Sequence, residues 1–133
     1  MVASQEGHAA TVKVLLKAGG NVNQAQTTTG CSPLFMVSQF GNVAIVKVLI
    51  KAGANVNQAT DDGRTPLYQA SVNGHLAIVK VLIKTGGNVN QARTTDGTSP
   101  LYIASEKGNV ATVKVLITAD SNVNQAKTTT GAS

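Results

Sequence analysis

The sequence predicts a mainly α-helical solenoid, in which repeated units of two helices and a hairpin-like loop stack side by side. Three markers recur along the 133-residue chain with one period. Asn-Val-Asn-Gln-Ala begins at residues 21, 55, 88 and 122, and Ser/Thr-Pro-Leu begins at residues 32, 65 and 99. Glycine followed by Asn or His occurs at residues 7, 41, 74 and 108. All three markers advance by 33 or 34 residues, which indicates true repeats.

Each unit is predicted to hold two helices, and the third unit shows the pattern most clearly. Thr65 is suited to cap a helix start, and Pro66 fits the first helical position. Gly74 then ends this helix, because glycine adopts the left-handed conformation at low cost. A second helix follows, closed by Gly86, with apolar residues at helical spacing: Leu76, Ile78, Val79, Leu82 and Ile83.

The segment after this helix pair, residues 88–97, is polar and rich in turn-forming residues, so a hairpin-like loop is predicted. The corresponding loop of the preceding unit is one residue shorter, which marks a surface loop. One unit cannot fold alone, because ordering each residue costs about 1.5 kcal/mol. Its few buried aliphatic side chains return only about 1.5–3 kcal/mol each. Neighbouring units must therefore stack.

The composition limits the class of protein. The chain is 42% hydrophobic and 13% charged, which permits a buried core and argues against disorder. Cys31 is the single cysteine, so no intrachain disulfide can form and a reducing compartment is expected. The N-terminus lacks a signal-peptide pattern, and lysines interrupt the longest apolar runs, which argues against a membrane span. These features predict an intracellular protein, with the cytoplasm as the expected location.

The residues of the third unit resemble the ankyrin repeat. The resemblance rests on Gly-Arg-Thr-Pro-Leu at residues 63–67, on Gly74-His75, and on Asn-Val-Asn at residues 88–90. It covers the chain as one domain, residues 1–133, with repeats at approximately 1–29 (truncated at its start), 30–62, 63–96 and 97–130. The family implies an L-shaped unit, in which a β-hairpin finger precedes an antiparallel helix pair. It also implies protein–protein recognition along a concave face.

Several positions depart from the family pattern. The family usually has a histidine after Pro-Leu that hydrogen-bonds to the next repeat, and here that residue is Phe35, Tyr68 or Tyr102. Apolar contact is therefore expected to replace these hydrogen bonds. Asp120 stands where glycine closes the other second helices, so the last helix is expected to end less favourably. Neither end shows a polar capping repeat, which predicts a fragment of a longer array that frays or stacks end to end with its own copies.

Residues suited to catalysis or metal binding are few. His8 and His75 share one repeat position, which is Asn in the other units, so both are expected to cap a helix start. Asp61 and Asp62 are adjacent on a hairpin and are expected to serve the turn rather than acid–base chemistry. Metal-binding and phosphate-binding motifs are absent from the sequence. We therefore expect no enzyme activity, no metal, no cofactor and no small-molecule substrate.

Lysines recur along the predicted second helices, in a chain whose net charge is +5: Lys13, Lys17, Lys47, Lys51, Lys80, Lys84 and Lys114. The family's geometry places these lysines on the convex back, where the simpler interpretation is a solvated face that keeps the array soluble. The alternative is a basic surface that binds a polyanion. No aromatic residues interleave with the lysines, which argues against single-stranded nucleic acid. Neither nucleic acid nor a membrane is the expected partner.

A further alternative comes from the family. Four asparagines each follow a leucine by eight residues, a spacing similar to that of asparagines hydroxylated in animal ankyrin repeats: Asn23, Asn57, Asn90 and Asn124. Two residues before each of them the family has Asp, and this chain has Asn. That difference argues against hydroxylation.

The expected partner is another protein, bound by residues that differ between units while the framework repeats. The family binds through finger tips and the concave ends of the first helices. The matching finger positions are Thr28, Thr29, Cys31, Asp61, Asp62, Arg64, Thr95, Asp96 and Thr98. The matching helix positions are Gln5, Glu6, Gln39, Phe40, Val72, Asn73, Glu106 and Lys107.

Phe40 and Arg64 are the expected anchors of this surface, since aromatic and arginine side chains dominate the energetics of interfaces. The alternative for Phe40 is that its ring only covers the groove beside Val72. The alternative function for the whole chain is that of a spacer within a long solenoid, with no partner of its own.

Overall fold

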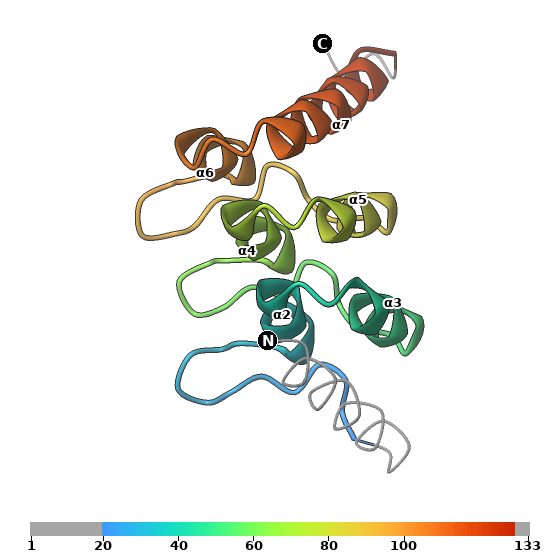
Figure 1. Ribbon diagram of the computed structural model, residues 1–133, viewed down its shortest axis with the longest axis vertical. Coiled ribbons are helices and arrows are strands. Elements are labelled where there is room, and N and C mark those ends of the chain that lie inside the picture. Colours follow the sequence, from blue (N-terminus) through green and yellow to red (C-terminus); the bar gives the residue numbers. More distant parts are fainter. Residues whose placement is uncertain (1–19, 130–133) are drawn as a thin grey trace.

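The structure, a computed structural model, describes residues 20–129, and within them it forms six α-helices in three consecutive pairs (Figure 1). The first helices of the pairs are α2 (Pro33–Phe40), α4 (Pro66–Asn73) and α6 (Pro100–Glu106). The second helices are α3 (Val43–Lys51), α5 (Leu76–Lys84) and α7 (Val110–Thr129). Connections of two or three residues join the helices of each pair, as in an αα-hairpin.

The helix pairs stack into two columns. Helices α2, α4 and α6 pack on one another in one column, and α3, α5 and α7 form the other (Figure 1). The loops between pairs project from the side of the first column, away from the second helices. We call these loops the fingers; the three within the described residues lie between residues 21 and 31, 55 and 64, and 88 and 98. The predicted mainly α solenoid is therefore confirmed.

The first helices begin and end at the predicted residues. The hydroxyl of Thr65 accepts a hydrogen bond from the N–H of Tyr68, and Ser32 and Ser99 cap α2 and α6 in the same way. Proline follows each cap at the first helical position, where the missing N–H is not needed. Gly74 ends α4 with φ +69°, a left-handed conformation that glycine adopts without strain.

The second helices bury one apolar face against the first column. In α5, Ile78, Val79 and Leu82 are buried, whereas Lys80 and Lys84 are exposed. Helix α3 repeats this pattern with the same residue types. Each buried aliphatic side chain contributes about 1.5–3 kcal/mol through the hydrophobic effect.

Helix α7 does not end where the second helices of the earlier repeats end. Helices α3 and α5 end within two residues of Gly53 and Gly86, whereas α7 runs through Asp120 and continues to Thr129. The sequence predicted that the last helix would end less favourably at Asp120. In the structure the helix does not end there but continues to Thr129. Gly53 and Gly86 adopt positive φ values without strain, whereas an aspartate adopts such a conformation only at a cost.

Candidate partner-binding surface

The second and third fingers each carry an arginine that covers an aromatic ring of the preceding first helix. The guanidinium carbon of Arg64 lies 5.3 Å from the centre of the Phe35 ring, and that of Arg93 lies 5.7 Å from the centre of the Tyr68 ring. Both rings are buried. The expected apolar contact is thus present, and a cation–π interaction accompanies it. Burial raises the pKa of the Tyr68 hydroxyl, with the nearby Arg93 charge acting in the opposite direction.

The two arginines reach these rings from opposite branches of their fingers. Arg64 follows the finger glycine Gly63, whereas Arg93 precedes Gly97. In both cases the guanidinium nevertheless lies over the ring that follows Pro-Leu in the preceding first helix. Arg93 was not among the predicted site residues, because it does not align with Arg64 between repeats.

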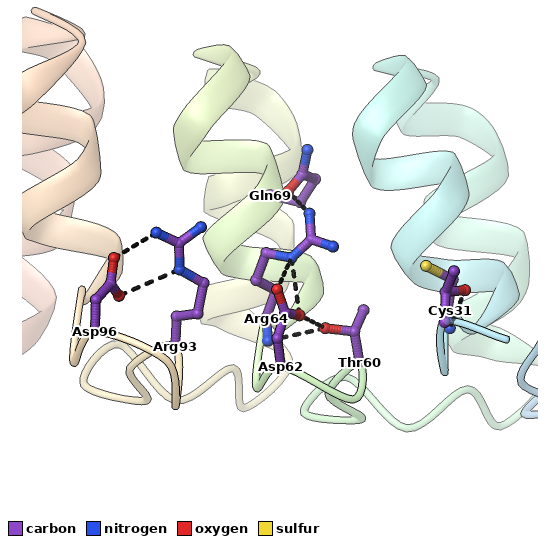
Figure 2. Close-up of polar contacts among 8 residues, drawn as sticks. Cys31, Thr60, Asp62, Arg64, Gln69, Arg93 and Asp96 are labelled. Carbon is purple, nitrogen blue, oxygen red and sulfur yellow. Dashed lines mark hydrogen bonds and ion pairs between the residues drawn. The ribbon is translucent and has the colours of Figure 1, made fainter.

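Asp62 fixes Arg64 inside the second finger (Figure 2). Arg64 Nε donates to both carboxylate oxygens of Asp62 at 3.0 Å, and Arg64 Nη1 lies 3.5 Å from Gln69 Oε1. The Thr60 hydroxyl also donates to Asp62. These bonds, the one from Thr60 above all, lower the pKa of the Asp62 carboxyl. Arg64 therefore already has partners within the fold, which weakens its predicted role as a partner anchor.

The third finger contains a similar ion pair, between Arg93 and Asp96 (Figure 2). Arg93 Nε donates to Asp96 Oδ1 at 3.2 Å, and Arg93 Nη2 donates to the second oxygen. The backbone N–H of Thr98 also donates to Asp96 Oδ1, at 3.1 Å. These bonds, that from Arg93 first, hold the pKa of Asp96 well below its usual range.

We predict that Asp96 titrates below the value of about 3.9 for a free aspartate. Because its folded-state pKa is lowered, the carboxylate stabilises the fold above the unfolded pKa, and this contribution disappears as the pH falls through the lowered value. Carboxyl-carbon NMR titration of the folded chain measures the midpoint. In Arg93→Gln, the midpoint should move upward. An Asp96 midpoint that is the same in both proteins would contradict the ion pair.

Asparagine side chains link each second-helix end to the next finger. Asn57 Nδ2 donates to the carbonyl of Gly86 at 3.0 Å, and Asn57 Oδ1 accepts from the N–H of Asn88 at 2.7 Å. Asn23 makes the same two bonds one repeat earlier. Asn90 donates one repeat later, to Asp120. The repetition of asparagine at these positions therefore has a structural explanation, independent of any hydroxylation.

His75 stands at the expected N-cap position of α5, but the expected capping by its side chain is not found. Instead, His75 Nε2 lies 3.1 Å from the carbonyl oxygen of Gln39, in the preceding repeat. Asn109 likewise donates to the carbonyl of Ser71 at 2.9 Å, whereas Asn42 does cap α3. This repeat position therefore serves contacts between repeats as well as capping. His8 lies outside the described residues.

The predicted site residues fall into two exposed rows. The exposed finger residues, the finger row, are Thr28, Thr29, Asp61, Thr95 and Asp96. The exposed residues at the ends of the first helices, the helix-end row, are Gln39, Phe40, Asn73, Glu106 and Lys107. Both lie on the column of first helices and fingers (Figure 1). The length of a first helix, roughly 12 Å, separates the two rows.

The remaining predicted site residues are less accessible. Asp62, Arg64, Val72 and Thr98 are half-buried. Cys31 is only 8% exposed, so its placement at a finger surface does not fit a role in partner contact. The family's finger positions predicted that Cys31 would be accessible, and the structure buries it. Gln5 and Glu6 lie outside the described residues.

A family comparison agrees with this geometry. The model for ankyrin repeats, in three copies, matches residues 1–93 and 58–129. The chain belongs to the ankyrin repeat family. Ankyrin repeats generally mediate contacts between proteins, so the two exposed rows are the natural candidates for a partner surface. A search of curated proteins found no match.

Three further observations concern other kinds of site in this ankyrin chain. Within residues 20–129, no group of three or more His, Cys, Asp or Glu side chains could hold a metal ion. In the same part of the chain, no helix has both the length and the apolar character to cross a membrane. Neither ion pair of the described residues includes a lysine. The described lysines of the second helices are all exposed: Lys47, Lys51, Lys80, Lys84 and Lys114.

Proposed function

We propose that this ankyrin chain is a non-catalytic protein-binding module that contacts its partner through the finger row and the helix-end row. The observation that supports this proposal is a contrast between repeat positions. Leu34 and Leu67 share one position and are buried, whereas Phe40, Asn73 and Lys107 share another and are exposed. A repeated framework with a variable exposed surface suits the recognition of another protein. An intracellular setting belongs to the proposal, since Cys31 is a free, buried thiol.

Phe40 is the preferred anchor within the helix-end row. Its side chain is 39% exposed at the end of α2, and it is the single aromatic residue of that row. Aromatic side chains supply much of the binding energy of protein interfaces. Arg64 is a less suitable second anchor. To contact a partner, its guanidinium would have to leave Asp62 and Phe35 or contact the partner in addition to them.

We predict that Phe40→Ala weakens partner binding by about 2 kcal/mol, because the anchor ring is lost. Calorimetric titration of the purified partner against both proteins measures this difference. Lys47→Ala, on an exposed position of α3, is the matched control and should bind as the unchanged chain does. Equal affinity of Phe40→Ala and the unchanged chain would remove Phe40 from the site.

A pull-down from cytosolic extract, at low and at high salt, tests the function itself. Capture that survives high salt and is lost in Phe40→Ala supports a specific protein partner. Capture that is lost at high salt and is indifferent to Phe40 favours a polyanion on the exposed lysines, since such binding is strongly salt-dependent. The absence of capture under both conditions favours the spacer function.

A further inference from the structure

The second helices present a stripe of exposed residues on the side that faces away from the first helices. Positions three or four apart lie on one face of a helix, so the residues of each stripe point the same way. Helices α3 and α5 contain no acidic residue, and the single acidic residue of α7, Asp120, accepts a hydrogen bond from Asn90. The three stripes are Ala44, Lys47 and Lys51; Ala77, Lys80 and Lys84; and Ala111, Lys114 and Thr118.

The described fold leaves the charge of these lysines uncompensated. The other acidic residues of the described chain lie in the fingers and in α6. Both ion pairs of residues 20–129 join an arginine to an aspartate within one finger. Like charges four residues apart on one helix repel each other, as those of Lys47 and Lys51 do. A surface that only keeps a protein soluble mixes both signs of charge. The single sign of this face therefore favours an anionic ligand.

The stripes lie side by side, because α3, α5 and α7 pack in one column (Figure 1). Packed helices lie about 8–10 Å apart, and residues four apart lie about 6 Å apart along a helix axis. Lys47, Lys80 and Lys114 share one repeat position and form a row along the stack. Lys51 and Lys84 form a second row beside it. We call these five residues the lysine track. Its charges follow the stack in one direction, as the charges of a linear polyanion follow its axis.

The residue types of the stripes narrow the kind of ligand. Protein interfaces are depleted of lysine and enriched in arginine and aromatic residues, and the stripes contain neither of these two. Single-stranded bases need aromatic side chains on which to stack. Binding within a membrane surface needs large apolar side chains, which the stripes also lack. Lysine supplies a flexible point charge for phosphate. The stripes therefore favour the phosphates of a duplex.

We propose that the lysine track binds the phosphate backbone of a double-stranded nucleic acid. The absence of interleaved aromatic residues argues against single strands, and it does not affect a duplex, whose phosphates are contacted without stacking. Each lysine donates to a phosphate oxygen, and binding releases counterions from the duplex. The fingers project away from the second helices, so this surface is separate from the proposed protein-binding rows (Figure 1).

Fluorescence polarisation of a labelled DNA duplex of about 20 base pairs, two helical turns, tests this proposal with the full chain. Affinity is measured from about 50 to about 200 mM salt, where each contacted phosphate contributes a slope of about −0.9 to the logarithmic plot. In Lys80→Gln, the slope should become shallower by about 1, and the affinity at the lowest salt should fall several-fold. Glutamine has a helix propensity close to that of lysine, so the fold should be kept.

Lys107→Gln is the matched control, because it removes the same charge from an exposed position in the helix-end row. It should leave the slope unchanged, and two duplexes of unrelated sequence should bind alike, since phosphate contacts carry no sequence information. Equal slopes for Lys80→Gln and the unchanged chain, or equal losses in Lys80→Gln and Lys107→Gln, would overturn the proposal.

Two further measurements separate this proposal from its neighbours. Phe40→Ala should bind the duplex as the unchanged chain does, so that the two proposed surfaces are tested independently. Vesicles of phosphatidylserine and phosphatidylcholine are titrated in parallel. A chain that does not bind the duplex at the lowest salt would overturn the proposal, and binding of the vesicles alone would identify a membrane surface as the ligand of the lysine track.

Discussion

Tyr68→Ala is expected to lower the free energy of unfolding by about 3–5 kcal/mol, the usual effect of removing a buried aromatic side chain. Tyr68 lies in α4, is 2% exposed, and is covered by Arg93 of the following finger. The substitution leaves a cavity at a contact between repeats, and it leaves Arg93 without its ring. Urea unfolding followed by circular dichroism measures the change in free energy.

The chain offers a matched control for this substitution. Tyr102 occupies the same repeat position but is 61% exposed, so Tyr102→Ala should change the free energy of unfolding by less than about 1 kcal/mol. The difference between the two variants isolates the contribution of the following repeat. Equal losses in both variants would mean that the stack of arginine on aromatic ring contributes little to stability.

The second large effect is expected from Gly63→Ala, in the second finger. Gly63 has φ +84°, which costs a residue with a side chain about 1–3 kcal/mol. A methyl group there would also lie 2.8 Å from the backbone nitrogen of Thr94, which donates to the carbonyl of Asp62 in the link between fingers. Overpacking of this kind costs about 1–3 kcal/mol more. Thermal and urea unfolding measure the sum.

Gly97→Ala separates the two contributions. Gly97 has a similar φ of +71°, but a methyl group at this position meets no described atom within 4 Å. The variant should therefore lose only the contribution of the backbone conformation. If Gly63→Ala and Gly97→Ala are equally destabilised, the close approach of neighbouring fingers does not constrain the stack.

The repeat and its helices could be predicted from the sequence because the decisive signals are local. The caps at Thr65 and Pro66, the glycine that ends α4 and the apolar spacing of α5 all act within a few residues. The period then follows from comparison of the chain with itself. These features do not depend on knowing which residues meet across repeats.

The candidate site was harder to predict, because exposure depends on neighbours about 30 residues away. Cys31 follows a finger glycine and is covered by its surroundings, and Arg64 is held by Asp62 and by a ring from the preceding repeat. Arg93 was missed because a long guanidinium can reach the same ring from the other branch of a finger. His75 turns toward a carbonyl of the preceding repeat, a contact that no local pattern announces.

Photo-crosslinking tests most directly whether a protein partner contacts the finger row and the helix-end row. A photoreactive amino acid is placed at Gln39, in the helix-end row, and in a second variant at Lys80, on the exposed side of α5. Both positions are exposed, so both variants should fold alike. We expect an abundant crosslink to a protein from position 39 and none from position 80. A crosslink from position 80 alone would contradict the claim and place the partner on the lysine-bearing helices.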